Sequence, residues 1–227
     1  MTDRSLHETF AAGDPAWPVV QSWIKGAKNR VEALPPDEAR KEQVLSELQV
    51  TLRSPMGAIV DQTGGLLVDH GWLRLLGSGH PRFARALSAW NRGRPIDAQG
   101  NSGGCMLVAD DVVGGFFALN GGAFQGRMTD VFYFAPDSLC WEPLTGMGYT
   151  EFLGWSLNSD LNKFYESFRW PGWRDEIASL NGDQALSIYP PLFTKEGKDI
   201  SRCSRKPCAV SEIYSLNVVE YPRQLGS

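Results

Sequence analysis

The chain has 227 residues, of which 42% are hydrophobic and 21% are charged, a composition typical of a globular protein rather than a disordered one. Its formal net charge of −4 and its pI near 5.4 leave no basic footprint for nucleic acid. The first residues, "MTDRSLHETFAAGDP", contain no apolar core of a signal peptide, and no window holds 18 uninterrupted apolar residues. We therefore expect a cytoplasmic protein that binds neither nucleic acid nor membrane.

Residues 1–52 predict a pair of helices. Asp14 is a favourable N-cap, Pro15 suits the first helical position, and apolar residues follow at helical spacing as far as Leu34. The proline pair at 35–36 ends this first helix. A second helix is expected over "DEARKEQVLSELQV", which carries apolar residues on one side and charges elsewhere.

Residues 53–148 predict mainly strands. The stretch "SPMGAIVDQTGGLLVDHGWLRLLGSGH" alternates short apolar runs with glycine, and a short helix is expected only in "HPRFARALSAWN". Four apolar segments then follow at a spacing of roughly ten residues: "CMLVAD", "GGFFALN", "DVFYFAPD" and "LCWEPL". No gap between these four is long enough for a helix, so they predict an antiparallel meander.

The remainder of the chain predicts helices over 149–181 and a tail of strand and loop over 182–227. The tail contains "LSIYPPLF" and "AVSEIYSLNVVEYP", whose flanking prolines favour edge strands or ordered loop over helix. The order of these segments predicts one α+β domain over residues 1–227, in which a central antiparallel sheet is flanked by helices on one face.

The stretch "DDVVGGFFALNGG" offers two interpretations, a ligand cradle or a β-hairpin. It fits neither a P-loop nor a dinucleotide fingerprint, whereas Asn120 followed by glycine between apolar runs is a strong hairpin signal. Asp110 and Asp111 are candidates for acid–base work or a hard metal ion. Because adjacent strand residues point to opposite faces, we instead expect one of the two aspartates to close a turn.

Two further segments supply candidate residues. His70, in "LLVDHGW", lacks a recognisable nucleophile partner, since no G-x-S-x-G elbow is present. The segment "FRWPGWRDE" places Arg169 and Trp170, then Trp173 and Arg174, side by side. Stacked guanidinium and indole groups suit a protein interface or a sugar surface. The alternative, which we favour, is that Trp173 anchors a short helix to the core.

The four cysteines predict no metal or cofactor site. Cys105 and Cys140 lie in apolar runs and are expected to be small buried side chains. Cys203 and Cys208 lie in "SRCSRKPC", where basic neighbours favour a lowered thiol pKa and leave open a reactive or disulfide-bonded pair. Structural cysteines in a reducing compartment are the favoured interpretation. No zinc ligand set, other metal site or cofactor loop is found, and no catalytic residue is nominated.

Several longer phrases carry a resemblance to a known family. "GWLRLLGSGHPRF", "GGFFALNGGAF", "DVFYFAPDSLCWEPL", "YTEFLGW" and "FRWPGW" resemble the bacterial domain-of-unknown-function family numbered 2625, from about Pro55 to the C-terminal strand. This family has no established activity, so the resemblance assigns no catalytic residues.

The chain is also similar to the SUKH superfamily of α+β proteins. The phrases "VVGGFFALNGG", "DVFYFAPDSLCWEPL" and "YTEFLGW" follow the superfamily's order of glycine-rich strand pair, aromatic strand with acidic turn, and helix. Many members are immunity proteins that neutralise toxins, and others are scaffolding proteins. The similarity therefore implies function by protein–protein contact.

These observations lead to a non-catalytic protein-binding module as the first prediction, of the toxin-neutralising immunity type. The acidic balance suits a basic partner such as a toxin or a nuclease. The alternative is a small-molecule-binding protein or hydrolase-type enzyme with a cleft near Asp110–Asn120, using those residues, Asp111 or His70. A homodimer that merely self-associates is a third alternative.

Overall fold

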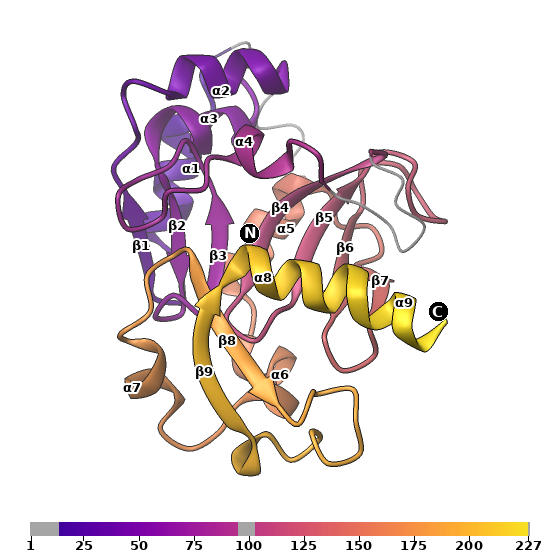
Figure 1. The fold of residues 1–227 in the computed structure, drawn as a ribbon. Helices are drawn as coiled ribbons and strands as arrows, with labels where there is room; N and C mark the ends of the chain where they lie inside the picture. The colour runs from indigo at the N-terminus through magenta and orange to yellow at the C-terminus, as the bar shows by residue number, and fades with distance from the viewer. Residues whose placement is uncertain (1–13, 95–102, 227) are drawn as a thin grey trace.

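The computed structural model describes residues 14–94 and 103–226, and within these ranges seven strands form one antiparallel sheet in chain order (Figure 1). Each strand pairs with its neighbours in the chain. We call this the main sheet, and its strands are β1 (Val31–Leu34), β2 (Gly65–Val68), β3 (Leu73–Leu76), β4 (Cys105–Asp111), β5 (Phe116–Asn120), β6 (Val131–Ala135) and β7 (Cys140–Pro143). The predicted α+β fold with a central antiparallel meander is confirmed.

Both faces of the main sheet are covered. Neighbouring residues on β5 point to opposite faces. The Phe117 ring meets Phe152 of α5 (Tyr149–Asn158) at 4.9 Å between centroids, whereas the Phe116 ring meets Tyr214 of α8 (Val210–Tyr214) at 5.2 Å. Figure 1 shows α8 in front of the sheet and α5 behind it. The expectation that helices flank one face only is therefore wrong.

The described part of the N-terminal region, residues 14–52, is one helix, one strand and a second helix rather than a helical pair. The first helix, α1 (Trp17–Lys25), begins after Ala16 without a side-chain cap, so the predicted cap at Asp14 is wrong. It ends at Gly26, and the chain then enters β1, which pairs with β2. Leu34 therefore fits helical spacing but belongs to a strand, because its backbone is held by the sheet. The second helix is α2 (Lys41–Leu48).

A helix, α3 (Pro55–Gln62), lies where the sequence predicted strands. The Ser54 side chain accepts a hydrogen bond from the Gly57 N–H at 3.0 Å, and Pro55 occupies the first turn. Residues 55–60 are all buried, so this helix has no polar face to mark its period. The helix expected in "HPRFARALSAWN" is only α4 (Leu87–Asn91), and residues 80–86 form a tight turn followed by irregular chain, a segment that we call the strap.

The segment after β7 is helical as predicted, and the tail is partly so. Residues 149–181 contain α5, α6 (Leu161–Phe164), a 3-10 turn (Glu166–Phe168) and α7 (Trp173–Ile177). The tail begins with a hairpin of β8 (Gln184–Tyr189) and β9 (Ser204–Ala209), with a 3-10 turn (Ile200–Arg202) between them. Residues 210–225, predicted as strand or loop, are instead α8, a π-helical turn (Ser215–Glu220) and α9 (Tyr221–Leu225).

The helical structure of residues 210–225 is determined more by packing than by the intrinsic helix propensity of these residues. Its β-branched and aromatic residues favour strand in isolation. Val210, Ile213, Tyr214 and Val218 are all buried, and their three- and four-residue spacing places them on one helical face. Contact with the sheet therefore decides the secondary structure. Among the described residues, none of the helices combines the length and apolar character needed to cross a bilayer.

The turn between β4 and β5 contains the glycine pair of the stretch that offered two interpretations, a ligand cradle or a β-hairpin. Asp111 accepts hydrogen bonds from the Val113 N–H at 3.0 Å and the Gly115 N–H at 2.8 Å, which confirms that one aspartate closes a turn. A Cβ atom at Gly115 would lie 2.2 Å from the Asp111 carboxylate and 2.3 Å from the hydroxyl of Tyr133. This glycine thus makes room for a buried carboxylate inside the protein.

The connection between β5 and β6 is longer than the tight turn predicted at Asn120. The residue is the last of β5, and residues 121–130 separate the two strands. The Asn120 side chain accepts hydrogen bonds from the Gly122 and Phe124 N–H groups and donates to the carbonyls of Phe124 and Arg127. The amide group of Asn120 therefore uses both its donors and its acceptor to hold the loop between β5 and β6 in place.

The buried Asp111 carboxyl makes folding pH-dependent. Burial raises the pKa of Asp111 to about 6, despite hydrogen bonds from the turn and from the Tyr133 hydroxyl. The unfolded value is about 3.9, so the folded state binds this proton more tightly, and the free energy of unfolding should fall by up to about 3 kcal/mol as pH rises from about 4 to about 6. Asp111→Asn should lack this component. Urea unfolding across that range would test it, and parallel pH profiles for the two proteins would contradict it.

Candidate functional site

A row of side chains crosses four strands of the main sheet on one face. The register pairs Glu32 with Leu67, Leu67 with Arg74, and Arg74 with Asp110. Side chains directly opposite one another on antiparallel strands share a face and contact each other. The sequence therefore places acid, apolar, base and acid in order from β1 to β4.

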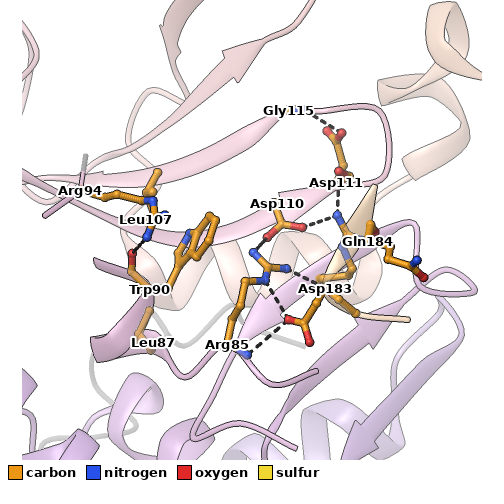
Figure 2. A network of polar contacts seen from close by, with 12 residues as sticks. Arg85, Leu87, Trp90, Arg94, Leu107, Asp110, Asp111, Gly115, Asp183 and Gln184 are labelled. Carbon is orange, nitrogen blue, oxygen red and sulfur yellow. Dashed lines mark hydrogen bonds and ion pairs between the residues drawn. The ribbon is translucent and has the colours of Figure 1, made fainter. Parts of the chain in front are cut away.

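The inner end of this row is a buried network (Figure 2). The Arg74 side chain is 1% exposed and forms an ion pair with Asp110, which is buried as well. Arg85 from the strap reaches the other Asp110 oxygen at 2.6 Å. Arg74 also donates hydrogen bonds to the carbonyl oxygens of Asp111, at 2.9 Å, and Gln184. Each carboxylate and guanidinium in this network faces an opposite charge.

Asp183, just before β8, holds the strap in place. It accepts hydrogen bonds from the backbone N–H of Ala84 at 2.6 Å and from the Arg85 Nε at 3.1 Å. Arg85 also donates to the Gly182 carbonyl at 2.7 Å. The network thus ties the main sheet, the strap and the start of β8 together, as Figure 2 shows for Arg85, Asp110 and Asp183.

The outer end of the row opens into a pocket of about 230 Å³. Its apolar wall comes from β2 and from residues 177–180, and residues 181–182 also line it. We call it the arginine pocket. Its charged and titratable lining consists of Arg30, Glu32, His70, Arg74, Arg82 and Arg174.

Two of the four arginines in this lining already have carboxylate partners. Arg82 donates to both oxygens of Glu32, at 2.6 and 3.2 Å, and this hydrogen bonding lowers the pKa of Glu32. Arg74 is balanced by Asp110. Within residues 14–94 and 103–226, Arg30 and Arg174 make no ion pair. The pocket is therefore positively charged.

Aromatic rings hold both of these arginines. Arg30 Nη1 lies 3.3 Å from His70 Nδ1, which must accept because a guanidinium only donates. The His70 ring meets Trp173 edge to face at 6.0 Å between centroids, and the Arg174 guanidinium lies 4.5 Å from the Trp173 centroid. Arg30 and Arg174 are thus linked through two rings. His70 itself occupies the left-handed region (φ 63°), in the turn between β2 and β3.

The other three candidates from the "FRWPGWRDE" segment, Arg169, Trp170 and Trp173, are buried behind the pocket. Trp170 and Trp173 pack against the buried Trp72 at 5.8 and 5.0 Å between ring centroids. The Arg169 guanidinium forms an ion pair with Asp69 and lies 4.3 Å from the Trp173 centroid. Trp173 thus anchors its helix to the core, and of these four candidates only Arg174 lines the pocket.

The structure brings together some of the predicted site residues and separates others. His70 and Arg174 line the same pocket, and Asp110 lies behind it, against Arg74. Asn120 pairs with Cys105, at the far end of β4 from Asp110, so the two do not form a common cleft. Asp111 points to the opposite face of the sheet, where it meets Tyr133.

Sequence reasoning missed three of the pocket arginines, namely Arg30, Arg74 and Arg82. One signal was available for Arg74, which stands inside the apolar run "LRLL" and therefore had to be buried and paired. The other two lie in polar stretches that look like ordinary surface.

The cysteines differ from expectation in two respects. Cys203 and Cys208 are both free, and burial raises the pKa of each thiol, that of Cys208 to about 11, so the predicted lowering by basic neighbours is wrong. Cys140 is exposed rather than buried, and Cys105 is partly buried. In the part of the chain that the structure describes, no group of three or more His, Cys, Asp or Glu side chains is placed to hold a metal ion.

The fold and the pocket together define an α+β protein with an antiparallel meander and a basic, ligand-sized hollow at one end of its sheet. The chain belongs to the family described as protein of unknown function DUF2625, whose sequence profile matches residues 6–213. This confirms the family resemblance seen in the sequence, while the similarity to the SUKH superfamily stays a prediction.

Two relatives match along almost their whole length. The "Putative uncharacterized protein YbfG" of Escherichia coli (strain K12) is 42% identical, over 94% of this chain and 95% of that protein. An "Uncharacterized protein" of Haemophilus influenzae (strain ATCC 51907 / DSM 11121 / KW20 / Rd) is 35% identical, over 96% and 95% respectively. No solved structure matches the chain significantly.

The buried end of the row should dominate stability. Asp110→Ala leaves the Arg74 and Arg85 charges without their shared partner, and breaking a buried pair in this way costs about 3–5 kcal/mol of unfolding free energy. Glu32→Ala breaks the more exposed pair with Arg82 and should cost less than about 1 kcal/mol. Urea unfolding of both variants measures the contrast. Similar losses for the two would contradict the assignment of Asp110 as the central acceptor.

Proposed function

We propose that the protein is a non-catalytic binding protein that captures an anionic ligand in the arginine pocket. The observation that carries this proposal is the charge of the lining, in which four arginines and a histidine face a single carboxylate that Arg82 already occupies. A guanidinium presents several N–H donors in a plane and binds carboxylate or phosphate groups through paired hydrogen bonds.

The two unpaired arginines are held ready for a ligand. Arg30 rests on His70 and Arg174 on Trp173, and the two rings contact each other. Side chains fixed in this way lose less conformational freedom when they bind, so more of the contact energy appears as affinity. An arginine without a ring contact of this kind would lose more conformational freedom on binding and would therefore contribute less affinity.

The floor of the pocket supports the same interpretation. Arg74 is buried and lines the pocket, and its Nε has no hydrogen-bond partner among the described residues. A buried N–H without a partner costs about 1–3 kcal/mol, so a donor of this kind favours a nearby acceptor. The anionic group of a ligand would bring negative potential close to the buried Arg74 guanidinium at the base of the pocket.

The chemistry of the lining supports binding rather than catalysis. Among the described residues, none of the side chains that line the pocket is a hydroxyl or thiol nucleophile. Its titratable members are occupied, Glu32 by Arg82 and the His70 Nδ1 by Arg30. The volume lies below the roughly 300–1,000 Å³ of pockets for drug-sized molecules, so the ligand is small.

Calorimetric titration with inorganic phosphate tests the proposal. The wild-type protein should bind one phosphate per chain, and Arg174→Gln should weaken binding about tenfold or more, because a charge-assisted hydrogen bond contributes about 1.5–3 kcal/mol. Arg53→Gln removes an exposed arginine that does not line the pocket and is the matched control. Absence of binding, or equal weakening by both changes, would contradict the proposal.

A protein-binding role is a second candidate, supported by the SUKH similarity and by the formal charge of −4. In that role the protein would neutralise a basic partner in the cytoplasm, such as a toxin or nuclease domain. A basic partner does not fit a basic pocket, so contact would lie on the outer surface. Capture of such a partner that is unaffected by Arg174→Gln would favour this candidate, and equal loss of partner and phosphate would count against it.

A further inference from the structure

We infer that the arginine pocket selects small dianions, a phosphomonoester or a dicarboxylate, over monoanions of the same shape. This inference rests on the proposed function and makes it more specific. It follows from the number of charges in the pocket that the protein leaves unbalanced, and from how those charges are held.

Among the described residues, the ion pairs account for every charged side chain that lines the pocket except two. Arg82 is paired with Glu32. Arg74 and Arg85 share Asp110, and Arg85 also meets Asp183, so these two arginines face two carboxylates. Arg30 and Arg174 remain, and no ion pair within the described ranges neutralises either of them.

The aromatic link joins two arginines that come from different parts of the fold. Arg30 precedes β1, and Arg174 belongs to α7, so they enter the pocket from different elements. The rings of His70 and Trp173, in edge-to-face contact, link the two side chains. A ligand with one negative charge would neutralise only one of the two, whereas a dianion neutralises both.

The surroundings strengthen this discrimination. Leu67, Ile177 and Leu180 form an apolar wall beside the charged groups. Attraction between opposite charges is stronger next to such a wall than in open water, because the local dielectric constant is lower. The second charge of a ligand beside this wall therefore contributes more than it would at the same distance in open water.

Matched probes separate charge from shape. At a fixed pH of about 8, where a phosphomonoester is close to fully dianionic, methyl phosphate would be compared with dimethyl phosphate, and succinate with butyrate, by calorimetric titration. We expect the dianion of at least one pair to bind about tenfold or more tightly than its monoanion, since one further charge-assisted contact forms. The pair that shows the preference identifies the source of the charge.

Variants then test whether Arg30 and Arg174 are responsible. Arg30→Gln and Arg174→Gln should each bring the ratio of dianion to monoanion affinity close to one, while some monoanion binding persists. Arg53→Gln should keep the wild-type ratio. A defect that only loosened the fold would weaken all probes together and leave the ratio unchanged, which would overturn the inference.

The outcomes distinguish the inference from the proposed function. If monoanions and dianions bind wild type equally well, the charge selectivity is refuted while anion binding stands. If none of the four probes binds, both are refuted. A dianion preference that disappears in the two variants and survives in the control supports both.

Discussion

The interaction on which the structure depends is the burial of the Arg74 guanidinium against Asp110 in the middle of the main sheet. Taking these charges out of water is costly, and the cost is offset only if the remaining donors and acceptors are satisfied. The sheet alone cannot do this. The strap supplies Arg85, and the chain leading into β8 supplies Asp183 and a carbonyl oxygen at Gln184. Segments about a hundred residues apart are thereby held at one point.

The same constraint determines where a ligand site can form. The strap is fixed at Arg85 by the buried network, and three residues earlier it presents Arg82 to Glu32 at the edge of the pocket. The opposite wall is fixed independently, by the tryptophan cluster beneath α7. The pocket is thus a space between two rigid attachments. Of its two unpaired arginines, Arg174 rests on Trp173 of the second attachment, and Arg30 is linked to the same tryptophan through His70.

Elements that are determined by neighbouring residues could be predicted from the sequence, whereas elements and contacts that depend on distant residues could not. The strands from 105 to 143 alternate with turns in the sequence, so the meander was predictable. Residues 55–60 of helix α3 are all buried and apolar, so they lack the polar positions that reveal a helical period. Residues 210–225 have a strand-like composition that packing on the sheet overrides. At the site, His70 and Arg174 stood out because of their neighbours. Arg30 and Arg82 did not, since their significance lies in partners that only the folded chain brings near.

The ion pairs of the strap constrain which substitutions this family can accept. The two arginines of the strap are three positions apart, yet they form ion pairs with carboxylates on different strands. Arg82 pairs with Glu32 on β1, and Arg85 pairs with Asp110 on β4. A lineage that loses Asp110 would leave the buried Arg74 charge unmatched and Arg85 with Asp183 alone, so the change favours replacement of Arg74 and Arg85 as well. Substitutions at these positions should therefore appear together in homologous sequences, whereas the exposed Glu32–Arg82 pair is free to drift.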